Sequence, residues 1–534
     1  MYESDDYKLH AVRVANYYLA LKQGQFPVRW GPNLNGGYGY PSFNYMYHTP
    51  YFIGAVLHST GFSVQESLNL TVLLSLLLAS VSCYFFVRSY STSEPWNMLL
   101  ALFFVLNPYI LLNVYWRGAI GELFFYATTP LFFLGIKHLL EGRKKDFYFL
   151  LTATSVMILT LSHLPSLIPL LLLFIFFIVT NKEKLSIKKA IFIVFACVLG
   201  FLLSAWYWIP AYFEQWMVIY ENAGSLAKYQ TQFVNSINLF TISKSGNSSE
   251  FFKDVLQIGS ISVVAFVFGI ALLRKTKKNT TWLLLIIICL VLISEASLPL
   301  WNKFTPLQYV QFPWRFLWII IFSTVMILIH IVTEKKVSHF IKKIIATSIF
   351  LGLIISTRSY VINKGETNRL DFDWYHPTFE TGSSFNEHLP VWAKTSYYFP
   401  DELLYVTATQ AATLQKNNLV TSIHKLSELQ PTILKFDGKT ISYSIHPDQE
   451  IIVLFKRLFY PGWEASLEKE KQKIIINIPE YEGIIAVTVP NQKSTVTIDF
   501  TGFTPLRKCA EIISVFSFLF LVGQIIFKQY KMRI

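Results

Sequence analysis

The sequence predicts a polytopic α-helical membrane protein with a β-rich domain near its C-terminus, on the extracytoplasmic side of the bilayer. Of the 534 residues, 53% are hydrophobic and only 15% are charged, with a mean hydropathy of +0.41. One soluble core cannot bury that much apolar surface. Basic residues gather in short loops between the apolar runs. Residues 361–507 are less hydrophobic, and they contain runs in which apolar and polar side chains alternate with period two.

The apolar runs predict about 11 membrane spans, because a span needs about 20 mostly apolar residues. Within 147–180 the break at His163-Leu164-Pro165 predicts two short helices rather than one long one. The predicted spans are 66–87, 98–113, 122–140, 147–163, 165–180, 189–210, 255–273, 281–300, 314–333, 343–360 and 509–527.

Basic loops orient these spans, because positively charged loops stay on the cytoplasmic side. Counting from them places residues 114–121, 211–254, 301–313 and 361–507 outside, and residues 1–65 with them. The basic segments are Arg143–Lys145, Lys182–Lys189, Arg274–Lys278, Lys335–Lys343 and the tail with Lys528, Lys531 and Arg533.

Four parts follow along the chain. Residues 1–65 form an outer first loop with amphipathic and interfacial helices, and 66–360 form the transmembrane helical domain. Residues 361–507 form the extracytoplasmic domain, and 508–534 form a C-terminal span with a basic cytoplasmic tail. An exported polar N-terminus needs an anchor, so we expect that a first helix is missing from this chain. We predict an interfacial helix over residues 45–62. The alternative is that these residues form a membrane span, which would place the N-terminus on the cytoplasmic side.

The second half of 361–507 predicts a small antiparallel β-sandwich. Residues Thr440–Ile445 and Ser494–Phe500 alternate with period two, as half-buried strands do. The pairs Asp437-Gly438, Pro461-Gly462 and Pro490-Asn491 are turn signals between such strands.

Several function classes lose support. The net charge of +13 is in the loops between spans, which argues against nucleic-acid binding. The four cysteines lie in apolar runs without metal-ligand or disulfide spacing. The sequence also lacks a P-loop, a dinucleotide glycine fingerprint and a nucleophile elbow. No Cys/His metal set is present, so we assign no residue as a metal ligand.

The N-terminal segment holds the first candidate site. If residues 5–22 are helical, Asp6 and His10 are one turn apart on one face and Arg13 follows one turn later, with Asp5 beside Asp6. An acid, an imidazole and a guanidinium would then point together. The alternative is a solvated helix face beside the membrane.

Glu122 begins an otherwise apolar helix after the outer loop that holds Arg117. A carboxylate at the edge of the hydrocarbon needs a partner. It could serve catalysis, or simply favour the helix dipole or pair with Arg117.

Further polar residues lie at the same depth. His163 is at the outer turn of the helical hairpin, and Gln311 and Arg315 begin a later span. A lone histidine is more often structural. An outer arginine among aromatics suits a lipid-linked phosphate, or anchors the helix at the interface.

The order of these features resembles the GT-C class of membrane glycosyltransferases. Five motifs carry a narrower resemblance: Asp6-x-x-x-His10-x-x-Arg13, Pro27-x-Arg29-Trp30, Tyr38-Gly39-Tyr40-Pro41, Gln311-Phe312-Pro313-Trp314-Arg315 and Tyr460-Pro461-Gly462-Trp463. With them the chain resembles the YfhO-like bacterial membrane proteins and their relatives named "6-pyruvoyl-tetrahydropterin synthase related".

The resemblance implies transfer of a sugar from a polyprenyl-phosphate donor to a cell-envelope glycan, lipid or protein at the bacterial plasma membrane. Asp6, or Asp5 in its place, would be the general base, with His10 and Arg13 orienting it or binding phosphate. Glu122 would be the second acid, and Arg315 or Arg117 would neutralise the leaving phosphate. Arg29, His163 and Gln311 complete the expected substrate-binding set. Whether a divalent cation joins the two acids stays open.

Two other functions are weighed against this one. A non-catalytic envelope assembly or lipid-handling protein could keep the same architecture. A secondary transporter would need inverted repeats and charged residues at the centres of spans, and the sequence has neither.

Overall fold

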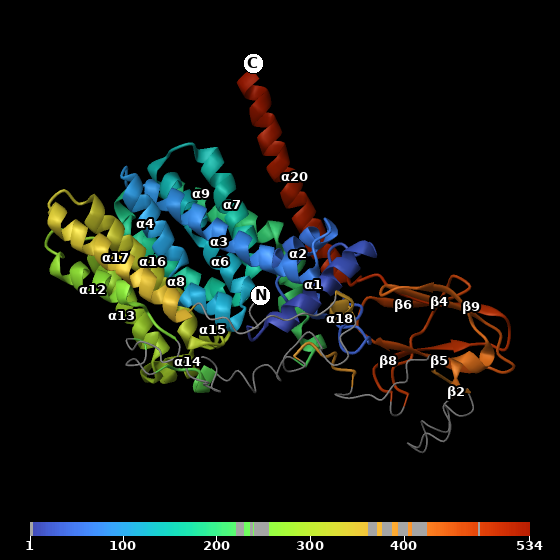
Figure 1. Cartoon of the computed structure of the whole chain (residues 1–534). Coiled ribbons are helices and arrows are strands. Elements are labelled where there is room, and N and C mark those ends of the chain that lie inside the picture. Colours follow the sequence, from blue (N-terminus) through green and yellow to red (C-terminus); the bar gives the residue numbers. More distant parts are fainter. Residues whose placement is uncertain are drawn as a thin grey trace.

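The computed structural model describes residues 4–219, 229–234, 239, 256–360, 371–375, 387–393, 404–407, 424–478 and 481–533. Figure 1 shows a bundle of helices, a β-sheet region to one side of it, and α20 leaving the junction between them. The first half of the predicted outer domain falls largely outside the described residues, as do 220–228, 235–238 and 240–254 of the predicted loop 211–254.

Helices occupy each of the predicted spans. Two of them, α7 and α8, are separated at His163, which has an extended backbone, so the predicted break is confirmed. The bundle helices are α3 (Val64–Arg88), α4 (Glu94–Val105), α5 (Pro108–Leu112), α6 (Ile120–Glu141), α7 (Lys145–Ser162), α8 (Leu167–Thr180), α9 (Ile187–Leu203), α10 (Ala205–Phe213), α12 (Ser260–Ala271), α13 (Asn279–Ile293), α14 (Leu298–Lys303), α15 (Thr305–Gln308), α16 (Leu317–Thr333), α17 (His339–Tyr360) and α20 (Pro505–Arg533).

Within the described residues, four helices are long and apolar enough to cross a membrane, or up to seven if each bent pair is one span. The predicted spans 98–113, 189–210 and 281–300 are not straight: they bend by 40°, 74° and 84°. At the first bend the cause is Pro108, which keeps Asn107 out of the helical region, with ψ at 156°. The other two bends fall at Ser204 and Ser294.

The N-terminal segment folds against the bundle. Helix α1 (Tyr7–Lys22) packs on α2 (Thr49–Ser59) and α3, and also contacts α18 (Asp371–Tyr375). With 11 residues, α2 rises only about 17 Å, well short of the ~30 Å hydrocarbon core. Residues 45–62 therefore do not form a span, and the reading as a short helix stands.

The C-terminal region contains two antiparallel sheets that face each other (Figure 1). The predicted strands Thr440–Ile445 and Ser494–Phe500 are β4 and β9, and they pair along their length. One sheet has the order β2-β1-β5-β8 and the other β3-β4-β9-β6-β7. Their bounds are β1 Leu404–Thr407, β2 His424–Lys425, β3 Thr432–Phe436, β5 Ile451–Leu458, β6 Trp463–Leu467, β7 Glu470–Gln472 and β8 Ile484–Val489.

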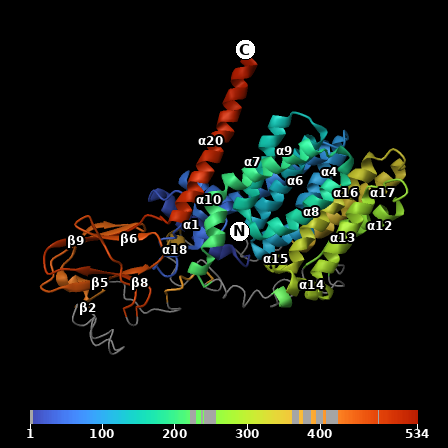
Figure 2. The same ribbon diagram turned by 180° about the vertical axis from the view of Figure 1, so that it is seen from behind.

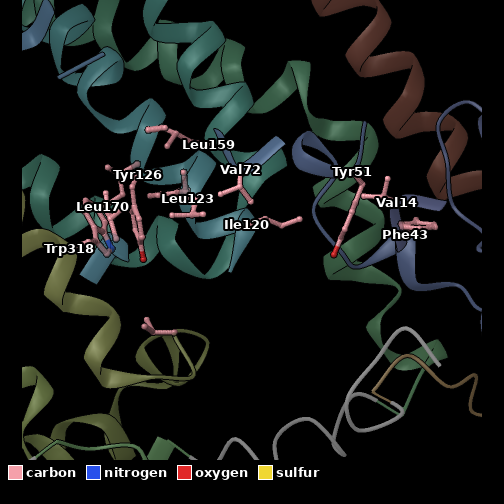
Figure 3. Packing of buried hydrophobic residues seen from close by; sticks show 14 of the residues in the cluster. Val14, Phe43, Tyr51, Val72, Ile120, Leu123, Tyr126, Leu159, Leu170 and Trp318 are labelled. Atoms are coloured by element: carbon pink, nitrogen blue, oxygen red, sulfur yellow. The ribbon is translucent and has the colours of Figure 1, made fainter. Parts of the chain in front are cut away.

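One continuous apolar core joins these parts. Figure 3 shows Tyr51 beside Val14 on the N-terminal segment, and Tyr126 and Leu170 with Trp318 in the bundle; all belong to the same cluster. Residues of the β-sheets, such as Val453 and Ile498, belong to it too. The N-terminal segment is therefore fixed against both the bundle and the sheets, and it can hold polar side chains at defined positions.

Candidate active site

The first two acidic residues are held against the loop that precedes α6. The backbone N–H of Asp5 donates to the Trp116 carbonyl at 2.9 Å, and that of Asp6 donates to the Arg117 carbonyl at 3.0 Å. Gly118 makes this approach feasible: its φ is +75°, and a Cβ there would lie 2.5 Å from Ser4 Oγ. The two outer loops singled out in the sequence therefore meet.

Helix α1 directs three polar groups to this meeting point. Asp6 is the residue before α1, and His10 and Arg13 follow on the same face. The Tyr51 hydroxyl lies 2.9 Å from His10 Nδ1 and accepts a hydrogen bond from Arg13 NH1 at 3.1 Å.

Burial shifts the acid–base properties of these groups. It raises the pKa of Asp6 to about 6, although the positive charges of Arg13 and Arg117 oppose the shift. Burial also lowers the pKa of His10 well below its ordinary value, and the charge of Arg13 adds to that effect. At neutral pH the site thus holds a neutral imidazole beside a carboxylate that is mostly ionised.

Glu122 is the most heavily bonded carboxylate of the site. It is 1% exposed in the first turn of α6. Arg117 donates to both of its oxygens, at 3.0 and 3.1 Å, and Arg315 Nε donates at 2.9 Å. The hydroxyls of Tyr109 and Tyr126 donate at 3.0 and 2.6 Å. The predicted pairing with Arg117 is confirmed, and it is one part of a larger network.

His163 and Gln311 flank this network. His163 Nε2 lies 4.0 Å from Glu122 Oε1, and its Nδ1 lies 2.7 Å from Ser166 Oγ. Gln311 Oε1 accepts from Arg315 NH1 at 2.9 Å. A Cβ at Gly121 would lie 2.7 Å from the Ser162 carbonyl, so glycine allows α6 to approach the end of α7 closely.

These groups surround a polar pocket of about 180 Å³. An apolar cavity of about 620 Å³ adjoins it, lined by aromatic residues such as Tyr207, Trp208 and Phe312. Met46 and Glu387 line both spaces. The polar pocket is lined by Asp6, Leu9, His10, Arg13, Met46, Tyr47, Arg117, Ala119, Glu122, His163, Arg315 and Glu387.

The family model described as "6-pyruvoyl-tetrahydropterin synthase related domain; membrane protein" matches residues 43–363, more than half of the chain. The chain belongs to this family. It is a membrane protein, and the resemblance found in the sequence is confirmed at this level. No curated protein and no solved structure matches the chain.

The family match covers one side of the pocket only. Arg117, Glu122, His163 and Arg315 lie inside residues 43–363, whereas Asp6, His10 and Arg13 precede them. Within the described residues, no three His, Cys, Asp or Glu side chains form a group that could hold a metal ion.

Three predicted site residues lie apart from the polar pocket. Asp5 is exposed and does not line it, so the geometry favours Asp6 as the first acid. Gln311 lines the apolar cavity and reaches the site through Arg315. Arg29 pairs with Glu511 at 3.0 Å, at the junction of the sheets and α20.

Sequence reasoning missed the tyrosines and one acid. Tyr51, Tyr109 and Tyr126 bind the charged groups, but nothing separates them from the many tyrosines expected at membrane interfaces. Glu387, the acid, begins the short segment 387–393, whose backbone forms hydrogen bonds with Met217 and Ile219. No local pattern marks it, because its place depends on that long-range pairing.

Proposed function

We propose that this protein is a membrane glycosyltransferase of the GT-C type, which transfers a sugar from a polyprenyl-phosphate donor to a cell-envelope acceptor. The reaction would take place at the extracytoplasmic face of the bacterial plasma membrane. The observation that carries the proposal is the contact between a polar pocket, with acids and arginines, and a larger apolar cavity.

The two spaces match the two parts of such a donor. An isoprenoid chain is apolar and would be accommodated among the aromatic walls of the larger cavity. The phosphate and sugar would then lie beside Met46 and Glu387, facing Arg13 and Arg315. Guanidinium groups suit phosphate oxygens because they donate paired hydrogen bonds.

Asp6 is the best candidate for the general base. In the reaction, an acceptor hydroxyl attacks the anomeric carbon, the bond from that carbon to the phosphate oxygen breaks, and the hydroxyl proton passes to a carboxylate. With a pKa of about 6, Asp6 is ionised at neutral pH and is a stronger base than an ordinary aspartate. A nearby arginine would neutralise the leaving phosphate.

Glu122 is assigned a positioning role. Five hydrogen bonds occupy its two oxygens, so it has little capacity left to accept a proton or a substrate hydroxyl. It fixes Arg117 and Arg315 at the pocket wall, where one of them can turn towards a phosphate.

The charge distribution along α6 supports the extracytoplasmic location. Glu122 lies at its first turn and Glu141 at its last residue, about 28 Å apart at the rise of an α-helix. Glu141 pairs with Lys137, Arg143 and Lys184. The pocket and the basic loops therefore lie about one bilayer thickness apart, and basic loops favour the cytoplasm.

The test compares Asp6→Asn with Asp146→Asn in a deletion strain of the source bacterium. Asp146 is an exposed aspartate in the first turn of α7, so it is the matched control. We expect the deletion to remove a glycan and to accumulate one polyprenyl-phosphate sugar. Asp146→Asn should restore the glycan and Asp6→Asn should not, at equal protein levels. An unchanged glycan profile in the deletion strain would refute the activity.

The apolar cavity also favours a second candidate, a lipid-handling protein without turnover. That function predicts binding of polyprenyl phosphate to the purified protein, together with full complementation by Asp6→Asn. Binding of polyprenyl phosphate together with full complementation by both Asp6→Asn and Asp146→Asn would therefore favour the second candidate over the first.

A further inference from the structure

A second polar pocket lies where the N-terminal segment, the five-stranded sheet and α20 meet. Its volume is about 240 Å³ and it shares no lining residue with the candidate active site. Figure 2 shows the start of α20 beside α10 and close to α1, with the sheets on the other side. The pocket is lined by Gly24, Gln25, Phe26, Pro27, Arg29, Lys439, Phe500, Thr501, Gly502, Lys508 and Glu511.

Two ion pairs, one buried and one partly buried, form the back of this junction. Arg507 Nε donates to Glu214 at 2.7 Å, and both side chains are almost fully buried. Arg29 donates to Glu511 at 3.0 Å, and also to the Trp206 carbonyl at 3.1 Å. Burial lowers the pKa of Arg29, and the positive charge of Arg507 adds to that effect.

Positive charge is in excess around the pocket. Glu214 and Glu511 neutralise the two arginines, which leaves Lys439 and Lys508 on the walls. Lys508 approaches Glu511 only to 3.9 Å, and Glu511 already binds Arg29. An anion in the pocket would meet the two lysines and the edge of Arg29.

Gln25 gives an independent sign of a missing acceptor. Its side chain is 6% exposed, and its Oε1 accepts a hydrogen bond from the Trp30 backbone at 3.3 Å. Its Nε2 has no hydrogen-bond partner among the described residues. A buried amide donor without an acceptor is costly, and an oxyanion would supply that acceptor. The wall at Gly24 is open, because a Cβ there would meet nothing within 4 Å.

Two exposed aromatic side chains lie next to the pocket. Phe26 lines it and is 79% exposed, and Phe503, which is 53% exposed, lies two residues before α20 begins at Pro505. Aromatic residues at the start of an apolar helix are typical of the membrane interface. The pocket therefore opens at the level of lipid headgroups.

We propose that this pocket binds a phosphate oxyanion, in the form of an anionic phospholipid headgroup or of free phosphate. The residues that recognise it are Lys439, Lys508, Arg29 and Gln25. The inference is independent of the glycosyltransferase proposal, since it uses none of that site's residues. Such a ligand would connect the sheets and α20 to the surrounding leaflet.

The test uses the full chain in nanodiscs, with bound lipids measured by native mass spectrometry. The probes are phosphatidylglycerol, phosphatidylcholine and inorganic phosphate. The variant Lys439→Gln/Lys508→Gln removes the two excess charges, and Lys471→Gln/Lys493→Gln removes two exposed lysines elsewhere in the β-region. We expect roughly tenfold weaker phosphatidylglycerol binding in the first variant, and less than a twofold change in the second.

Gln25→Met separates ligand binding from structure. It keeps the side-chain volume and removes the unpaired donor together with the long hydrogen bond from Trp30, so anion affinity should fall several-fold while the unfolding temperature of the ligand-free protein falls only slightly. Binding of inorganic phosphate with the same dependence on the two lysines would support the pocket and identify the free anion as the ligand. Equal binding of all three probes by the wild type and the lysine variants would overturn the proposal.

Discussion

Replacing Glu122 with glutamine should destabilise the protein strongly, because it leaves two buried arginines without a counter-ion. Glu122, Arg117 and Arg315 are all less than one tenth exposed. Removing one partner from a buried ion pair costs about 3–5 kcal/mol, and hydrogen bonds to charged groups contribute about 1.5–3 kcal/mol each. We therefore expect Glu122→Gln to lose at least about 3 kcal/mol of unfolding free energy.

A double-mutant cycle isolates the charge interaction. Arg315→Met alone leaves the Glu122–Arg117 pair intact and should cost less than Glu122→Gln. The two changes combined should cost less than their sum, by a coupling energy of about 1–3 kcal/mol. The assay measures the unfolding of detergent-solubilised protein by heat and by denaturant titration.

The exposed pair Arg88–Glu94 supplies the matched control. These residues lie 3.6 Å apart and are about half exposed, and Arg88→Met with Glu94→Gln should give a coupling energy of about 0–1 kcal/mol. If the Glu122–Arg315 cycle gives a coupling as small as this control, the reasoning about the buried network is wrong.

Three further predictions follow from the same geometry. Because burial raises the pKa of Asp6 from 3.8 to about 6, its protonated form favours folding; that stabilisation is complete below about pH 4 and is lost as the pH rises through 6. Asp6→Asn should thus be more stable than wild type at pH 7 but not at pH 4, and the proposed transferase activity of the wild type should rise through pH 6; parallel stability curves would contradict the shift. Gly118→Ala should lower the unfolding temperature more than Gly142→Ala does, because both glycines have φ near +75° but only a Cβ at Gly118 meets another residue, Ser4; equal losses would mean that the N-terminal contact carries no strain. Glu214→Gln should cost about 3–5 kcal/mol by leaving Arg507 buried without its partner, whereas the exposed Glu464→Gln should cost less than about 1 kcal/mol in the same unfolding assay.

The sequence predicts the helices and the paired strands well, because both depend on local periodicity. The break at His163 and the strands at 440–445 and 494–500 follow from residues that are neighbours in the chain. The bends at Ser204 and Ser294 were missed. The apolar run continues across Ser204, whereas at the second bend Ser294, Glu295 and Pro299 interrupt the run and could have marked the change of direction. Hydropathy reports burial in lipid or protein but not the direction of the helix axis.

The candidate site was predicted by residue type and not by partnership. Glu122 and Arg315 are 193 positions apart, and their contact depends on how α6 and α16 pack. Arg29 illustrates the same limit: its motif with Trp30 suggested a substrate site, but Trp30 packs on Trp463 and Phe500 of the sheet. The motif residues 29–30 and 460–463 thus join the sheets to the N-terminal segment.

The two acids of the pocket differ in environment, and this difference assigns their roles. Glu122 has both oxygens occupied by two arginines and two tyrosines, which stabilise its charge and leave no easy site for a proton. Asp6 makes no side-chain capping bond to α1, and its pKa of about 6 is close to the pH at which a base must exchange protons. Carboxylates in contrasting environments are how one site can hold a fixed charge and a proton acceptor together. In the proposed reaction the N-terminal segment would therefore contribute the reactive group, and the family-matched bundle would contribute the groups that position the substrate.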